Sequence, residues 1–333
     1  LGGLLLGFAL LADHFEHSGV PQRMARALPM GTRGAFLLLV LVFALSTVLD
    51  NIAAALVGGS TAAVVFRGKV HVGYLAAIVA ASNAGGAPSV LGDTTTTMMW
   101  LSGKGPWEVA HAAVGSVVAL LVFGGFAARQ QCAFQPERAA PRELPPLDGA
   151  RLAIVVAILV GAVVANLQTG YPALGVWAAL LLATPLRSPH WSLLPGAAKG
   201  MAFLLALVVS ASLMPVESLP AASSATTFAL GVVSSCFDNI PLTKLALTQG
   251  GYDWGFLAFA VGYGGSMLWF GSSAGVALTA LFPSAKSTGG WLRHGWHVPV
   301  AYAVAFAVML WTLGWHPEHG GAAKTHPPAA HTR

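Results

Sequence analysis

An aspartate in the middle of a long apolar run constrains this chain more than any other feature. Asp50 stands next to Asn51 in LSTVLDNIAAAL, residues 45–56, and the run 34–66 holds no other charge. A carboxylate at the depth of a lipid bilayer costs several kcal/mol unless it is paired, solvated or protonated. We therefore interpret Asp50 as part of a functional site inside a membrane protein.

The same element occurs a second time. Residues 233–244 read VSSCFDNIPLTK, which places Asp238 and Asn239 in the same pattern as the first aspartate and asparagine. Two such elements in hydroxyl-rich surroundings, one in each half of the chain, indicate a duplicated site. Internal repeats of this kind are typical of secondary transporters.

The composition supports a membrane location. The 333 residues are 56% hydrophobic and 9% charged, whereas soluble domains are roughly 25% charged. We expect an all-α polytopic membrane protein whose partner is the lipid bilayer. A net charge of +5 would suggest nucleic acid for a soluble protein, but here the basic residues lie in short loops and act as topology signals, so no nucleic-acid partner is expected. Cys132 and Cys236 are too few for a disulfide framework or a metal motif.

The length of the first charged apolar run predicts a re-entrant hairpin. A straight helix over 34–66 would measure ~50 Å against a hydrocarbon core of ~30 Å, and two full spans need roughly 40 residues. Both limits are satisfied by a half-helix that enters the membrane, a polar tip at Asp50-Asn51 and a second half-helix that leaves it again. We expect the same over 221–249, where Asp238-Asn239 form the tip and Pro241 opens the outgoing half.

Two further segments predict discontinuous helices. The first, 72–101, contains ASNAGGAPSVLGDTTTTMM, in which Gly and Pro interrupt the helix and free carbonyl and amide groups. Its second half begins near Asp93, where a helix N-terminus favours an ionised carboxylate. The second, 252–282, carries Gly264-Gly265-Ser266 and Gly271-Ser272-Ser273 in its middle. Broken helices of this kind build sites at the bilayer midplane of transporters.

The basic residues predict that the two halves are inverted. If both hairpins are re-entrant and both broken helices cross, one side of the membrane collects all of the 17 Lys and Arg except Lys104, Lys244, Lys324 and Arg333. That side is cytoplasmic by the positive-inside rule. The second hairpin then enters from the face opposite to the first.

This arrangement gives two inverted-topology repeats, 1–128 and 152–315. A cytoplasmic linker, 129–151, joins them, and the external tail, 316–333, is expected to be disordered. Plain spans are expected over 107–128, 152–165, 172–186, 199–214 and 297–315. The chain begins inside an apolar helix without a Met, so we expect further helices upstream.

The polar groups predicted at the midplane are carboxylate, amide and hydroxyl oxygens without Lys, Arg or His. They are Asp50, Asn51, Asn83, Asp93, Thr95, Thr96, Ser234, Asp238, Asn239, Ser266, Ser272 and Ser273. Such hard oxygens suit a hard cation such as Na⁺ or Li⁺. A membrane carboxylate that holds a proton and a metal ion in turn, with alternating exposure, performs cation/proton exchange. No cofactor is expected beyond the transported ion.

Other interpretations exist for the same residues. The threonines could hydrogen-bond within their helix, the serines could be small packing residues, and the aspartates could be structural. A metal ion could be bound by His14, Glu16 and His17, although a solvated helix end is the favoured interpretation. The histidines of the tail could bind another metal ion. Residues 271–275 match G-x-S-x-G, but the strand-turn-helix context of that motif is not expected here. We find no nucleophile–base pair or HExxH motif and expect no enzyme.

The chain resembles the NhaD-type sodium/proton antiporters of the ion transporter superfamily, which also holds arsenite pumps and dicarboxylate and citrate carriers. The resemblance lies in STVLDNIAAAL (46–56), ASNAGGAPSVLGDTTTTMMW (81–100), SSCFDNIPL (234–242) and GGSMLWFGSSAG (264–275). It implies Na⁺(Li⁺)/H⁺ antiport by an elevator-type movement, with functional positions at Asp50, Asn83, Asp93, Thr95, Thr96, Ser234, Asn239, Ser272 and Ser273.

The resemblance also implies a location in a bacterial inner membrane. Members of the superfamily commonly form homodimers, so a homodimer is expected. Where the family usually has threonines after its first LDN, this chain has Ala53, Ala54 and Ala55. The alternative function within the same superfamily is a cation-coupled carrier of citrate or dicarboxylates, or of arsenite.

Overall fold

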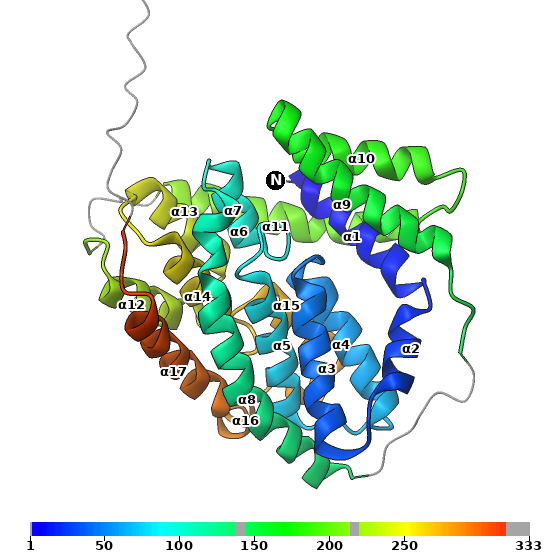
Figure 1. Ribbon diagram of the computed structural model, residues 1–333, viewed down its shortest axis with the longest axis horizontal. Helices are drawn as coiled ribbons and strands as arrows, with labels where there is room; N and C mark the ends of the chain where they lie inside the picture. Colours follow the sequence, from blue (N-terminus) through cyan, green and yellow to red (C-terminus); the bar gives the residue numbers. More distant parts are fainter. Residues whose placement is uncertain (1, 137–143, 214–219, 318–333) are drawn as a thin grey trace, which may run out of the picture.

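All regular elements in the described ranges of the computed structural model, 2–136, 144–213 and 220–317, are helices (Figure 1). The first half of the chain forms α1 (Gly2–Glu16), α2 (Val20–Ala27), α3 (Gly31–Ser46), α4 (Asn51–Val65), α5 (Val72–Gly86), α6 (Thr94–Leu101), α7 (Pro106–Ala110) and α8 (Ala112–Phe134). The second half forms α9 (Gly149–Thr169), α10 (Pro172–Ala183), η1 (Trp191–Leu193), α11 (Leu194–Ser212), α12 (Ser224–Ser234), α13 (Asn239–Gln249), α14 (Trp254–Gly264), α15 (Ser273–Leu281), η3 (Pro283–Ala285), α16 (Thr288–His294) and α17 (His297–Thr312).

The helices present apolar side chains outward, as a protein in lipid must. Leu121 on α8, Val156 on α9, Leu182 on α10 and Trp311 on α17 are all exposed. By length and composition, the continuous helices Pro106–Phe134 and Gly149–Thr169 could each cross a membrane, and α16 with α17 could form a third, bent span. Several other apolar helices in the described ranges have only 10–17 residues. This pattern is consistent with a membrane protein that contains interrupted helices.

Each segment expected to contain a hairpin or a broken helix holds a pair of short helices. In the hairpin segments, α3 and α4 are joined by residues 47–50, and α12 and α13 by residues 235–238. In the segments expected to be discontinuous, residues 87–93 separate α5 from α6, and residues 265–272 separate α14 from α15. Figure 1 shows α3, α4 and α5 packed beside one another near the centre of the molecule.

Several helix ends differ from those expected from the sequence. Helix α3 begins at Gly31 rather than residue 34, because Thr32 and Arg33 occupy its first turn, where polar side chains can face solvent. Helices α9 and α11 begin before the spans expected from residues 152 and 199, and α8 continues to Phe134, past the span expected to end at residue 128. The last turns of α8 are anchored by Gln131, whose side chain accepts a hydrogen bond from His71 N and donates one to Lys69 O. Of the tail, 318–333 lies outside the described residues.

The hairpins and the broken helices touch through their backbones. A Cβ atom at Gly92 would collide with the carbonyl oxygen of Ser46 at the end of α3. In the second half a Cβ atom at Gly271 would collide with the carbonyl oxygen of Ser235, just after α12. Only glycine permits so close an approach between two backbones. A close backbone contact of this kind therefore occurs in both halves of the chain.

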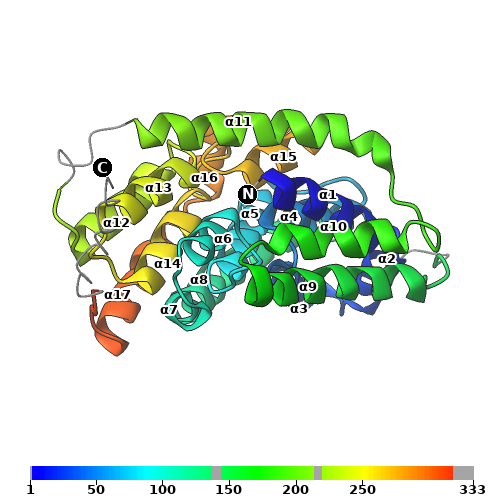
Figure 2. The same ribbon diagram turned by 90° about the horizontal axis from the view of Figure 1, so that it is seen from above.

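The apolar interior consists of two separate clusters. The larger one joins α3, α5, α8, α14 and α17 with their neighbours. The smaller one joins α1, α9 and α10 through residues such as Leu11, Ile158 and Leu180, and it also includes Leu49 and Val57 at the first hairpin. Figure 2 shows α11 running along one face of the molecule, and it packs against α1 and α13. The boundary between the two clusters therefore passes along α4.

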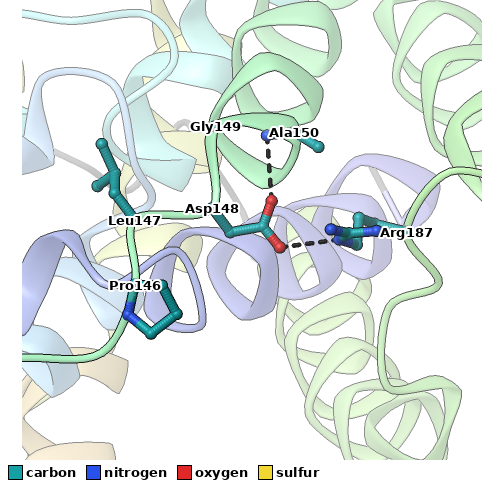
Figure 3. A pocket seen from close by; sticks show the side chains of 6 residues that line it. All are labelled: Pro146, Leu147, Asp148, Gly149, Ala150 and Arg187. Carbon is teal, nitrogen blue, oxygen red and sulfur yellow. Dashed lines mark hydrogen bonds and ion pairs between the residues drawn. The ribbon is translucent and has the colours of Figure 1, made fainter.

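An ion pair fixes the beginning of α9 beside a surface pocket of about 330 Å³ (Figure 3). Asp148 Oδ1 accepts hydrogen bonds from Ala150 N and Arg151 N, and its Oδ2 accepts one from Arg187 Nε at 2.8 Å. The hydrogen bond from Arg187 is the main reason that the pKa of Asp148 lies below its ordinary value. The charged carboxylate ties α9 to the connection between α10 and η1.

We predict that Gly92→Ala destabilises the protein, because the added methyl group forces the first hairpin and the broken helix apart. Overpacking of this kind costs about 1–3 kcal/mol. Thermal unfolding of the purified protein in detergent measures the effect. Gly125→Ala on α8 is the matched control, since a Cβ there meets open space, and an alanine in a helix interior is neutral or stabilising by up to about 1 kcal/mol. Equal stability of the two variants would contradict the packing argument.

Candidate functional site

A buried carboxylate occupies the centre of the candidate site. Asp93 ends the irregular segment 87–93 and precedes the first turn of α6, and it is almost completely inaccessible to solvent. Its Oδ1 accepts a hydrogen bond from Asn51 Nδ2 at 2.9 Å, and its Oδ2 accepts one from the hydroxyl of Thr95. A charge in the interior of a protein requires such partners, because burial removes its hydration.

Two asparagines extend the cluster from the first half of the chain into the second. Asn51 Nδ2 also donates to Asn83 Oδ1 at 2.9 Å. Asn83 Nδ2 in turn donates to Ser266 Oγ at 2.9 Å and to Ser272 Oγ at 3.2 Å. These side chains come from α4, from α5 and from the irregular segment between α14 and α15. The structure thus brings together Asn51, Asn83, Asp93, Thr95, Ser266 and Ser272, all of which the sequence analysis selected.

Four helices begin at residues of the predicted site. They are α4 after Asp50, α6 after Asp93, α13 after Asp238 and α15 after Ser272. Each helix N-terminus carries a partial positive charge that stabilises a nearby anion. The positive ends therefore offset part of the cost of holding carboxylates in the interior.

Asp50 and Asp238 lie outside the hydrogen-bonded cluster but close enough to Asp93 to interact with it electrostatically. Asp50 Oδ1 accepts a hydrogen bond from Ile52 N, and Asp238 Oδ1 accepts one from Ile240 N in the same geometry. Both side chains are half-buried. Each aspartate therefore caps its helix with its Oδ1 atom.

The surroundings of these two aspartates differ. Asp50 faces a cavity of about 440 Å³, which is also lined by Asp13 and Glu16 from α1 and by Met201 from α11. Asp238 Oδ2 instead accepts a hydrogen bond from Ser273 Oγ at 3.3 Å. The cavity is lined by residues of the smaller apolar cluster, such as Phe8 and Ala53, so Asp50 faces a cavity beside α1 and α11.

Three predicted site residues take no part in the side-chain hydrogen bonds described around Asp93. The hydroxyl of Thr96 donates to the backbone carbonyls of Ser89 and Asp93 rather than to a carboxylate. Ser234 Oγ donates to Val261 O at 2.8 Å and so fastens α12 to α14. Asn239 is buried at the beginning of α13, and the described hydrogen bonds around Asp93 do not include it.

Gly262 lies beside the hydrogen-bonded cluster and was not selected by the sequence analysis. A Cβ atom at this position would lie 3.2 Å from Asp93 Oδ2 and 3.9 Å from Thr95 Oγ1. When Gly85-Gly86 is aligned with Gly264-Gly265, this glycine falls opposite Asn83. The sequence alignment of the two halves therefore contained the signal for Gly262, because the second half has no side chain where the first half has an amide. Without a side chain at this position, the backbone of α14 can lie close to the carboxylate.

The chemistry of the cluster is that of hard oxygen atoms. Carboxylate, amide and hydroxyl groups meet there, and none of the described side chains that hydrogen-bond within it is basic. Oxygen atoms of this kind are the ligands preferred by hard cations. The arrangement can therefore hold either a proton or a small cation beside Asp93.

Two curated proteins of Arabidopsis thaliana are similar to this chain. One is 30% identical over an alignment of 289 residues, and the alignment covers 72% of this chain and 49% of that protein. The other is 29% identical over an alignment of 307 residues, and the alignment covers 72% of this chain and 67% of that protein. Both bear the name sodium/proton antiporter. The chain thus spans about half the length of the first relative and about two thirds of the second, and no family model matches it.

Proposed function

We propose that the protein is a secondary transporter of the NhaD type that exchanges Na⁺ or Li⁺ for protons. The observation that carries the proposal is the buried carboxylate of Asp93, surrounded by amide and hydroxyl groups from both halves of the chain. The similarity to two proteins called sodium/proton antiporters supports the same conclusion.

In the proposed exchange, one carboxylate binds a proton and a cation in turn. The cation binds Asp93, and the oxygens of Asn83, Thr95, Ser266 and Ser272 are neutral ligands. A bound proton neutralises the same carboxylate, so the two cannot bind together. A bound proton or a bound cation each offsets the free-energy cost of the buried charge. States in which the site carries one of the two are therefore favoured. Asp50, which lines the cavity beside α1 and α11, relays ions between this site and water.

We propose that transport uses an elevator-type movement between two inverted repeats. Two apolar clusters that meet along α4 provide two bodies that can move as units. The body that contains the candidate site would shift relative to α1, α9 and α10, so that the site opens to each side alternately. In this topology the two helical hairpins are re-entrant, and the connection that includes Asp148 is cytoplasmic.

An organic-anion or arsenite carrier is the competing function within the same architecture. An anionic cargo needs hydrogen-bond donors or positive charges to offset its own charge. The described cluster instead contains a carboxylate and no basic side chain. Na⁺-dependent uptake of radiolabelled citrate or succinate would favour the carrier over the antiporter.

We predict that Asp93→Asn abolishes cation/proton exchange, because the amide can neither bind a proton nor neutralise a cation. In everted membrane vesicles, addition of Na⁺ or Li⁺ should dissipate a preformed ΔpH with the unaltered protein and not with the variant. Asp148→Asn, at the surface end of α9, serves as the control and should retain exchange. If Asp93→Asn dissipates ΔpH normally, the proposed site is wrong.

We predict different outcomes for two neighbouring threonines. Thr95→Ala removes a hydroxyl from the carboxylate, and a hydrogen bond to a charged group contributes about 1.5–3 kcal/mol. The Na⁺ concentration for half-maximal exchange should therefore rise at least about tenfold. Thr96→Ala, which loses only bonds to backbone carbonyls, should lower thermal stability without this rise. Equal effects on Na⁺ dependence would show that hydroxyl position does not matter.

We predict that Gly262→Ala changes cation selectivity. The methyl group would lie against Asp93 Oδ2 and narrow the space beside it, which disfavours the larger Na⁺ more than the smaller Li⁺. The ratio of half-maximal concentrations for Na⁺ and Li⁺ should rise, as measured in the same vesicles. Gly125→Ala, remote from the site, should leave the ratio unchanged, and an unchanged ratio in Gly262→Ala would remove this glycine from the site.

A further inference from the structure

A second cluster of titratable side chains lies at the end of α1, apart from the hydrogen-bonded cluster around Asp93. Asp13 is on the last turn of the helix, His17 directly follows the helix, and His190 comes from the connection between α10 and η1. Both imidazoles approach one oxygen, with His17 Nδ1 3.0 Å and His190 Nδ1 2.8 Å from Asp13 Oδ1. We propose that these three residues form a binding site for a divalent transition-metal ion of the Zn²⁺ type.

The donor set suits such an ion. Two imidazole nitrogens and one carboxylate oxygen are typical of zinc sites with three protein ligands, where water fills the fourth position. Imidazole favours Zn²⁺ and its neighbours, whereas Na⁺ and Mg²⁺ favour oxygen. This site therefore differs in kind from the oxygen cluster around Asp93.

The spacing is also appropriate. In a tetrahedral site with bonds of ~2.0–2.1 Å, neighbouring ligand atoms are about 3.3 Å apart. The ligand atoms of the three residues all lie within 4.8 Å of one another. A small rotation of the two rings therefore suffices to place an ion between them.

The carboxylate is held in position while the imidazoles remain accessible. The side chain of Asp13 is only 2% exposed, whereas those of His17 and His190 are 48% and 52% exposed. The second carboxylate oxygen of Asp13 accepts a hydrogen bond from His190 N at 3.0 Å. Metal ligands are commonly oriented by such secondary hydrogen bonds. The two rings leave an open side through which an ion and its water can enter.

When both imidazole rings are neutral, the metal ion can bind without changing the number of protons that the rings carry. In the metal-free form His190 Nδ1–H donates to Asp13 Oδ1, and His17 Nδ1–H donates to the backbone carbonyl of Asp13 and lies close to its Oδ1. When the ion binds, each ring carries its proton on Nε2 and presents the Nδ1 lone pair. Two hydrogen bonds are thus replaced by coordinate bonds. The bound ion links α1 to the chain segment just before α11, so it would brace the body formed by α1, α9 and α10.

Co²⁺ titration of the purified full chain in detergent tests the proposal, because tetrahedral Co²⁺ absorbs strongly in the visible range. His319, His326 and His331 are first replaced by Gln to remove competing ligands. We expect one Co²⁺ per chain with tetrahedral absorption, displaced by Zn²⁺. His17→Gln and His190→Gln should each weaken binding at least about tenfold. His111→Gln and Glu16→Gln, which remove an exposed imidazole and a nearby carboxylate, should not.

The histidine variants decide the outcome, because Asp13→Asn also removes the acceptor that holds the connection and could prevent folding. The assay measures metal binding alone, so its result is independent of whether the protein exchanges cations for protons. If neither His17→Gln nor His190→Gln weakens Co²⁺ binding, or if no stoichiometric binding occurs, the proposal is wrong and the cluster serves only to hydrogen-bond the connection to α1.

Discussion

The structure depends on satisfying helix ends that lie inside the protein. Helices α4, α6, α13 and α15 all begin near the candidate site, and each N-terminus has backbone N–H groups without a helical partner. Lipid supplies no water for these groups. Asp50, Asp238 and Ser272 meet this need by accepting hydrogen bonds from the first turns of their helices. The polar and charged residues that lie in the interior therefore also cap the N-termini of its helices.

Irregular backbone at this depth is tolerated only because protein covers it. The segment before Asp93 packs against the end of α3, and the segment before Ser272 packs against the end of α12. Gly92 and Gly271 allow these backbones to touch, which excludes both lipid and bulk water from the free polar groups. Across the two halves, α6 packs against α13 and α15 packs against α4. Close packing thus creates the site rather than merely surrounding it.

The sequence was sufficient to predict the short helices that surround the site and most of the clustered side chains. Charges, glycines and prolines inside apolar runs mark where a helix cannot continue, whatever its neighbours are. Helix ends were less predictable, since a polar residue such as Gln131 stays helical when a distant loop binds it. The different contacts of Thr95 and Thr96 depend on how α6 is rotated, which local sequence does not specify. The two apolar clusters arise from contacts between distant segments and have no local signal.

The two halves contain similar sequence motifs and similar close backbone contacts, but their side-chain chemistry differs. Asp50 and Asp238 retain one geometry, whereas Asp93 corresponds to Ser272 and Asn83 to Gly262. The first half thus supplies the buried carboxylate and the bridging amide, and the second half supplies hydroxyl acceptors and a glycine that lets the backbone approach the carboxylate closely. A second carboxylate in place of Ser272 would put two buried charges close together, which repel each other strongly in a medium of low dielectric constant. The serine avoids that repulsion and leaves Asp93 as the carboxylate of the described hydrogen-bonded cluster.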